Sequence, residues 1–312
     1  MTSIIITYID EHDFLAEAVK SAMKQRLEAM ELIVVCNKAN LPDGYDPLPD
    51  LKSNFKFIHE PVPGSAHARN AGLRNASGEW IQFLDVDDLI LPEKIKHQLL
   101  VAKEGAIVSP HIFKFLDGST QVSKWLPDDN WIGLLNSGLG STSSMLFHRE
   151  SLMKIGGWST AYQSHQEYEL LFRLVSSGYK ISSVDHQETI VRERISGSIT
   201  KDTLPVRAKE GIQLREKIWE YLVQNGMDTP ARKNAFLQYI FRQLRGVYRL
   251  DRNEAMKIYR KYFSGHFFTP EKIGIPFYAF LYQGVGFNIT ERVFSTYSKV
   301  RNKFFPFLPK NH

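Results

Sequence analysis

The stretch Glu79-Trp80-Ile81-Gln82-Phe83-Leu84-Asp85-Val86-Asp87-Asp88 joins an apolar run to three carboxylates. The apolar and aromatic part, from Trp80 to Leu84, has the length and composition of a buried strand. Pro92 follows at a place that proline favours, the first turn of a helix. The acids therefore fall on a loop at the carboxyl end of a strand, which is where open α/β sheets bind ligands.

Three acids this close repel one another unless a cation lies among them. Asp85 and Asp87 are two residues apart, so they can place oxygens on the same side of the loop. Hard divalent ions take oxygen ligands and are often shared between carboxylates and a substrate's phosphates. The stretch predicts a metal–diphosphate site, and the alternative is a solvated acidic turn that caps the next helix, with Asp88 near its N-terminus.

Strands and helices alternate around this stretch. Period-two apolar runs predict strands, and helical spacing of apolar residues predicts helices between them. This alternation predicts an α/β fold of Rossmann-like type, with a mostly parallel sheet flanked by helices on both faces. The expected strands are 3–7, 31–36, 55–59, 80–84, 106–109, 121–125, 145–147, 180–184 and 189–194, and the expected helices are 14–23, 65–75, 92–103, 131–135 and 167–177.

Charge divides the chain of 312 residues into two parts. Residues 201–312 hold 20 Lys and Arg against 9 Asp and Glu, a balance of +11, whereas residues 1–200 have 19 against 25, or −6. We therefore predict a catalytic domain over 1–200 and a basic, aromatic-rich helical extension over 201–312. The lone cysteine, Cys36, and the lack of a recognisable signal peptide favour a reducing, cytoplasmic location.

Several motifs in order resemble the inverting family 2 glycosyltransferases, which carry a GT-A nucleotide-sugar-binding fold. The resemblance covers roughly residues 3–200. The matching segments are Ser3-Ile4-Ile5-Ile6-Thr7-Tyr8, the Ala-Arg-Asn-Ala-Gly helix at 68–72, the Gly-Glu-strand-Asp-x-Asp-Asp segment at 78–88, Gln166-Glu167-Tyr168-Glu169-Leu170, and the closing segment 192–198 with Gly197-Ser198.

The resemblance implies roles for residues that would bind the sugar donor. Asp85 would contact the ribose or the metal, and Asp87 would hold an Mn²⁺ or Mg²⁺ ion that bridges the diphosphate and neutralises the leaving group. Arg69 would contact the nucleotide or the diphosphate; a helix-surface salt bridge is the alternative. Thr7 and Tyr8 would line the pocket for the base.

Glu167 is the candidate general base. Inversion in a single displacement needs a carboxylate that takes the proton of the acceptor hydroxyl as it attacks the anomeric carbon. The family usually has Asp here, after an acid that Gln166 replaces, and Glu169 is the fallback base. An acid cluster that merely complements the dipole of its own helix is the alternative.

Three further positions are candidates for binding the sugar donor. Asn37 stands near the place where the family has an Asp that recognises the base, and its amide can both donate and accept hydrogen bonds. Arg194 replaces a frequent His; it cannot bind a cation but could meet a phosphate. Trp158, after two glycines, could stack on a sugar ring or belong to the core.

The basic extension mixes cations and aromatic rings, up to the terminal Phe304-Phe305-Pro306-Phe307 cluster. This composition fits an interfacial contact with an anionic membrane surface, a helical core of its own, or a homodimer interface. No recognised nucleic-acid module is present, so we expect no nucleic-acid partner.

These inferences predict a metal-dependent inverting glycosyltransferase for hexosyl or N-acetylhexosaminyl transfer. It would move a sugar from a UDP-sugar to a hydroxyl of a surface polysaccharide or lipid-linked glycan, as a peripheral protein on the inner face of the cell membrane. The alternatives are a sugar nucleotidyltransferase and a glycan-binding, nucleotide-binding or scaffold protein with impaired catalysis.

Overall fold

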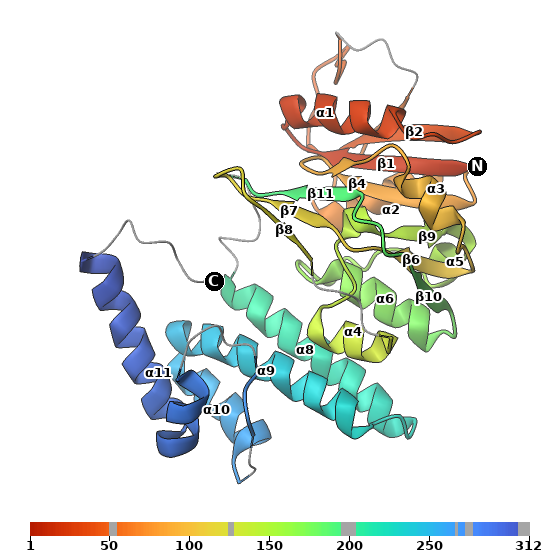
Figure 1. The fold of residues 1–312 in the computed structure, drawn as a ribbon. Helices are drawn as coiled ribbons and strands as arrows, with labels where there is room; N and C mark the ends of the chain where they lie inside the picture. Colours follow the sequence, from red (N-terminus) through yellow and green to blue (C-terminus); the bar gives the residue numbers. More distant parts are fainter. Residues whose placement is uncertain (50–54, 124–127, 195–203, 266–267, 272–276, 305–312) are drawn as a thin grey trace. The chain divides into compact units, whose positions relative to one another are not determined.

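The computed structural model describes residues 1–49, 55–123, 128–194, 204–265, 268–271 and 277–304. The chain forms two compact units, Met1–Ile199 and Thr200–His312. Figure 1 shows a sheet with helices in the first unit and helices alone in the second. The Gly197-Ser198 segment and the aromatic cluster after Phe304 lie outside the described residues.

The first unit is built on a seven-stranded sheet of order β10-β6-β9-β4-β1-β2-β3. The four strands β4, β1, β2 and β3 are parallel, and so are β10 and β6, while β9 runs antiparallel to both its neighbours. This arrangement confirms the predicted α/β class. The strands are β1 (Thr2–Tyr8), β2 (Met30–Cys36), β3 (Lys56–His59), β4 (Trp80–Asp85), β6 (Gly105–Val108), β9 (Leu146–His148) and β10 (Lys180–Ser183).

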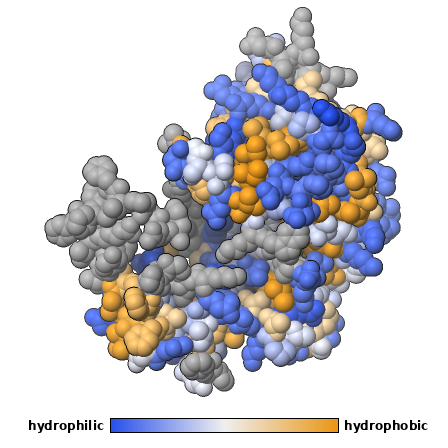
Figure 2. Space-filling view, in the orientation of Figure 1, coloured by the Kyte–Doolittle hydropathy of each residue, from blue (hydrophilic) through white to orange (hydrophobic). Residues whose placement is uncertain are grey.

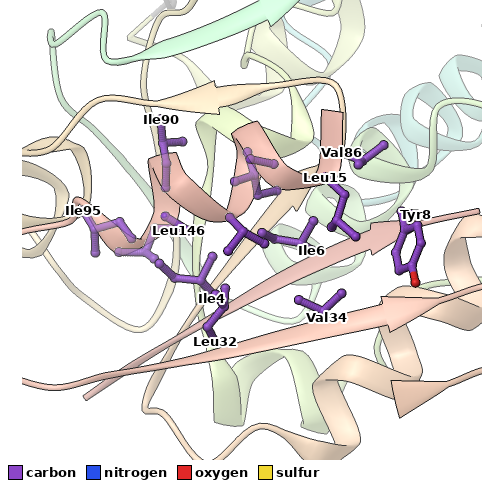
Figure 3. Packing of buried hydrophobic residues seen from close by; sticks show 14 of the residues in the cluster. Ile4, Ile6, Tyr8, Leu15, Leu32, Val34, Val86, Ile90, Ile95 and Leu146 are labelled. Carbon is purple, nitrogen blue, oxygen red and sulfur yellow. The ribbon is translucent and has the colours of Figure 1, made fainter. Parts of the chain in front are cut away.

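Helices cover both faces of this sheet because successive strand side chains point in opposite directions. On one face, Ile4 and Ile6 pack in a cluster with the buried side of α1 (His12–Met23) (Figure 3). On the other face, Ile5 meets α2 (Ser65–Asn75), where a Cβ on Gly72 would lie 2.4 Å from Ile5 Cγ2. Glycine at position 72 therefore allows α2 to lie directly on β1.

The remaining helices of the first unit pack around the sheet. The helix α6 lies against β6 and β10, and α4 lies against α6. The bounds are α3 (Lys94–Leu99), α4 (Asn130–Asn136), α5 (Arg149–Lys154), α6 (Gln166–Ser176) and the 3₁₀ turn η1 (Thr142–Ser144).

A second, four-stranded sheet has the order β5-β11-β7-β8, with bounds Leu89–Ile90, Thr189–Arg192, Ile112–Lys114 and Thr120–Val122. Asp85–Asp88 therefore connect the two sheets. The solvated helix-capping turn considered for Asp88 is wrong, because Asp88 is 4% exposed, is followed directly by β5, and α3 begins only at Lys94.

The second unit consists of α8 (Leu204–Gln224), α9 (Pro230–Leu250), α10 (Arg252–Phe263) and α11 (Tyr278–Phe304). Phe241 lies at the centre of its core, with ring centroids of five other aromatics within 6.2 Å: Phe263, Phe268, Tyr278, Tyr282 and Phe287. These aromatics of the extension thus belong to a core of its own. No helix within the described ranges is both long and apolar enough to cross a membrane.

Candidate active site

The loop that carries the acids is anchored at the carboxyl edge of the large sheet. Asp85 is the last residue of β4 and lies in register with Thr7 of β1. Its N–H donates to Ser143 Oγ over 3.1 Å, and the Asp88 N–H donates to the Asp85 carbonyl over 2.9 Å. These bonds fold residues 85–88 into a turn that keeps the three carboxylates together.

Arg69 connects this turn to another part of the unit. Its Nη2 lies 2.6 Å from Asp85 Oδ1, and its Nη1 donates to Gln166 Oε1 over 3.0 Å. Ser65 Oγ donates to the same Gln166 oxygen, so the beginning of α2 and the beginning of α6 meet here. Arg69 is 7% exposed, which places it inside the site rather than on a helix surface.

Glu167 lies next to Gln166 in the first turn of α6 and is half-buried. Arg69 contacts both Gln166 and Asp85. Because Glu167 directly follows Gln166, these contacts link the candidate base to the acid loop. The structure disfavours the fallback base. Glu169 is 3% exposed and accepts from Arg173 Nε and Nη2 through both of its oxygens, each over 2.8 Å.

The electrostatics of the acids show an uncompensated negative charge. Burial, followed by the charge of Asp85, raises the pKa of Asp87, and the Arg194 guanidinium only partly opposes this. Burial and the neighbouring Asp85 and Asp87 also raise the pKa of Asp88 well above its ordinary value. A cation among these oxygens would relieve both effects.

Two arginines of the closing segment face the acid loop. The Arg192 N–H donates to Asp88 Oδ1 over 3.3 Å, and its Nε donates to the Asp87 carbonyl. Arg194 Nη1 lies 3.1 Å from Glu11 Oε1 and 3.6 Å from Asp87 Oδ2. Arg194 thus pairs with acids in this structure, beside Asp87.

The donor set fits a hard divalent ion. Asp85 and Asp87 offer carboxylate oxygens from side chains that are 33% and 25% exposed, and oxygen ligands of this kind suit Mg²⁺ or Mn²⁺. An ion held there would supply positive charge beside a bound diphosphate.

Asn37, predicted to bind the base of the sugar donor, has other partners. It is 6% exposed; its Nδ2 donates to the Glu60 and Val62 carbonyls, and its Oδ1 accepts from the Gly64 N–H. Both donors of its amide are therefore used within the protein. Asn37 shapes the turn before α2, which carries Arg69.

Trp158 and Tyr8 also face the interior. Trp158 is 2% exposed, packs edge-on against Phe83 and lies under the Arg69 guanidinium at 4.6 Å, so the core alternative holds. Tyr8 is 2% exposed, and its hydroxyl lies 2.9 Å from the Tyr45 hydroxyl. Thr7 is half-buried at the strand edge, beside Asp85, and stays a candidate.

Sequence reasoning missed Ser143 and Glu11, which the structure brings to the site. Ser143 accepts from the Asp85 N–H, and Glu11 accepts from the Ile9 and Asp10 N–H groups as well as from Arg194. Burial acts to raise the pKa of Glu11, but these hydrogen bonds outweigh it and hold the pKa below its ordinary value. The small-residue run 140–144 is the only signal in the sequence that points to Ser143.

A mostly parallel sheet with acids at its carboxyl edge is the arrangement of α/β proteins that bind ligands at the ends of their strands. Residues 3–156 of the first unit match the family model described as glycosyl transferase family 2, so this segment is a family 2 domain. An uncharacterized glycosyltransferase of Haemophilus influenzae is 28% identical over 201 residues, which cover 58% of this chain and 66% of the relative. A relative from Rickettsia felis is matched over 33% of its length.

Another relative has a named activity. The Escherichia coli UDP-Glc:alpha-D-GlcNAc-diphosphoundecaprenol beta-1,3-glucosyltransferase WfaP is 25% identical over 205 residues, 64% of this chain and 80% of that protein. Among solved structures, Staphylococcus aureus TarS 1-349 with UDP-GlcNAc has a TM-score of 0.57 at 15% identity, covering 82% of this chain and 75% of that one.

The mannosyltransferase PcManGT from Pyrobaculum calidifontis, in complex with GDP-Man and Mn2+, has a TM-score of 0.55 at 17% identity, covering 98% of this chain and 81% of that one. At such low identity these structures establish the fold, and they confirm the GT-A arrangement of the sheet and its helices.

Proposed function

We propose that the protein is an inverting glycosyltransferase that moves a hexosyl or N-acetylhexosaminyl group from a UDP-sugar to a hydroxyl of a lipid-linked glycan or surface polysaccharide. Asp87, with Asp85, would hold Mn²⁺ or Mg²⁺ against the diphosphate. Arg69 would orient Asp85, Arg194 would meet a phosphate, and Glu167 would accept the proton of the attacking hydroxyl.

One observation carries this proposal: the chain Asp85–Arg69–Gln166 joins the acid loop to the beginning of α6, where Glu167 lies. A transferase that inverts in one step needs acids on two sides of the sugar, one for the leaving diphosphate and one for the incoming hydroxyl. A sugar nucleotidyltransferase would have no use for the second acid. The match of residues 3–156 to the family 2 glycosyltransferase model supports the same reaction class.

The substrate classes rest on the relatives. WfaP takes UDP-Glc and acts on a sugar linked to diphosphoundecaprenol, and TarS was crystallised with UDP-GlcNAc. PcManGT instead was crystallised with GDP-Man, so the base is the part of the proposal that most needs a test. Because the Asn37 amide is engaged elsewhere, recognition of the base would depend on Thr7 and on backbone groups.

A screen of nucleotide sugars tests the proposal. The purified full chain is incubated with UDP- and GDP-sugars, with and without Mn²⁺, and the nucleoside diphosphate released by slow hydrolysis is measured. We expect release from a UDP-sugar that depends on Mn²⁺. Absence of both binding and release for every nucleotide sugar would favour the scaffold alternative, and NMR of a transferred product reports whether the anomeric configuration is inverted.

The second unit supports a peripheral membrane contact. Phe277, just before α11, and Phe280 in its first turn are 80% and 77% exposed. Val285 is exposed before a break in the helix at Gly286, and Ile289 and Val293 are exposed four residues apart after it. Figure 2 shows apolar residues gathered on the surface there. Exposed apolar side chains on helical segments of a basic unit can lie at the interface of an anionic membrane.

Vesicle binding tests this contact. The double variant Phe277→Ser/Phe280→Ser should sediment less with phosphatidylglycerol vesicles than the unchanged protein does, while its circular dichroism stays the same. Equal sedimentation would overturn the membrane role. A concentration-dependent change in mass that the double variant abolishes would instead make α11 a homodimer interface.

A further inference from the structure

A group of metal-ligating side chains lies outside the acid loop. His97 of α3 and His186 and Glu188 of the connection between β10 and β11 each offer one ligand atom, and these atoms all lie within 4.8 Å of one another. His97 Nδ1 is 2.9 Å and 3.0 Å from the two Glu188 oxygens. The rings of His97 and His186 stack with their centroids 4.3 Å apart.

We propose that these three residues, named here the His97 triad, bind a zinc ion. Two imidazole nitrogens and one carboxylate oxygen form a ligand set that borderline metals such as Zn²⁺ prefer, whereas Mg²⁺ and Mn²⁺ prefer the all-oxygen set of the acid loop. The chain would then select different ions at its two sites. Three protein ligands leave a fourth tetrahedral position for a water molecule.

His97 and Glu188 already have the spacing of ligands to one ion, whereas His186 must turn, because its ring plane is only 20° from that of His97 and the two nitrogen lone pairs do not converge. Bonds of about 2.0–2.1 Å to a tetrahedral zinc place ligand atoms about 3.4 Å apart. His97 and Glu188 are already closer than this, and His186 is exposed, so rotation of the His186 side chain can complete the site. The half-buried position of His97 and Glu188 limits the water that competes for them, because their side chains are 29% and 16% exposed.

The triad lies at one end of the β5–β11 pair, and the acid loop lies at the other. Glu188 accepts from the Leu91 N–H through its carbonyl, over 2.9 Å, next to the register pair Thr189 and Ile90. At the far end of β11, Arg192 contacts Asp87 and Asp88. An ion at the triad would therefore fix the beginning of the strand whose end holds the acid loop.

Cobalt and zinc titrations of the full chain test this proposal. Co²⁺ added to the chelator-treated protein should give the visible absorption of a tetrahedral site with one equivalent bound, and Zn²⁺ should displace it. His186→Ala and Glu188→Gln should each weaken binding at least tenfold. His186 is exposed, so its variant should keep the thermal midpoint of the metal-free protein, which separates lost binding from lost folding.

Two controls separate the triad from other sites. His59→Ala removes an exposed histidine outside the triad and should leave the titration unchanged. Asp87→Asn disables the acid loop and should also leave the cobalt absorption unchanged. The proposal is overturned if the unchanged protein binds no Zn²⁺ below about 100 µM, or if His186→Ala binds as tightly as the unchanged protein.

Discussion

Buried and half-buried carboxylates have opposite surroundings in the two units. In the first unit, Asp87 and Asp88 lie beside Asp85, and burial with this neighbouring charge raises the pKa of both. In the second unit, Glu291 is 1% exposed but accepts from Arg245 Nε over 2.7 Å and from the Tyr278 hydroxyl. Asp87 and Asp88 lack enough positive charge nearby, whereas Glu291 is paired with an arginine and a hydroxyl of the protein itself.

The difference separates a binding site from a structural contact. A buried acid with a matched arginine and hydroxyl ties two helices together, and here Glu291 of α11 is tied to α9. Acids that crowd one another destabilise the fold and persist where a ligand of opposite charge compensates them. This contrast predicts that changes at Asp87 harm activity and spare the fold, and that changes at Glu291 do the reverse.

The largest expected effect is that of Asp87→Asn. Loss of the metal-binding carboxylate removes several kcal/mol of stabilisation from the leaving diphosphate, so kcat/KM should fall about 10⁴-fold. The free energy of unfolding should stay unchanged or increase, because a repulsive charge is removed. Metal-dependent sugar transfer and urea unfolding are measured on the same protein; a large loss of stability would contradict the contrast.

Glu167→Gln should act on the chemical step alone. Removal of a general base slows transfer by about 10²–10⁴-fold, while binding of the sugar donor stays within about twofold. Single-turnover transfer and calorimetric binding measure the two quantities.

Glu169→Gln is the matched variant two residues on. It breaks the buried pair with Arg173, so it should lower the thermal midpoint instead of acting mainly on the chemical step. The prediction for Glu167→Gln is contradicted if that variant transfers the sugar at the normal rate, because the general base would then be another residue.

Much of this site could be predicted from local sequence, but its partners could not. The apolar run 80–84 and the acids after it predicted a strand end with a charged loop, and the observed β4 ends at Asp85. The pairing of Arg69 with Gln166 spans 97 residues and depends on how α2 and α6 meet. Asn37 and Trp158 have the same limit: an amide or an indole can contact a ligand or pack in the interior, and local sequence does not decide between the two.

The second sheet is the main element that sequence patterns missed. Strands near β8 and β11 were expected, but β5, β7 and the pairing of all four were not. The two missed strands, β5 and β7, are two and three residues long, which is too short for a period-two pattern to be recognised. β5 and β11 are about 100 residues apart, so no local turn signal announces their pairing. Because β5 was not predicted, the residues after Asp88 were expected to form a helix, and Asp88 was interpreted as its possible cap.

Glu291→Ala should have a smaller effect than the substitutions at Asp87 and Glu167, and it should lower stability only. It leaves Arg245 buried without its carboxylate, which costs about 3–5 kcal/mol. Hydrogen exchange of α9 and α11 amides measures the loss in the second unit. Glu254→Ala is the matched control, because its pair with Lys257 is exposed and contributes at most about 1 kcal/mol. Equal effects of the two substitutions would remove the structural role of Glu291.

The smallest expected effect is a pH dependence from Asp88. Its pKa is raised in the folded protein, so between the ordinary carboxyl pKa and the raised one the folded chain binds a proton that the unfolded chain releases. The free energy of unfolding must therefore fall as pH rises through that window, by at most about 1.4 kcal/mol per pH unit for one proton. Asp88→Asn should reduce this slope to the part that Asp87 contributes, because the pKa of Asp87 is also raised, and the exposed Asp13→Asn should keep the full slope.

Mn²⁺ should flatten the slope of the unchanged protein, because a cation at Asp85 and Asp87 lowers the negative charge that Asp88 experiences. Urea midpoints between pH 5 and 8, with and without Mn²⁺, measure the effect. If the free energy of unfolding of Asp88→Asn varied with pH as it does in the unchanged protein, the charge of Asp88 would be compensated by neighbouring groups, as that of Glu291 is. The contrast between the two units would then no longer distinguish a binding site from a structural contact.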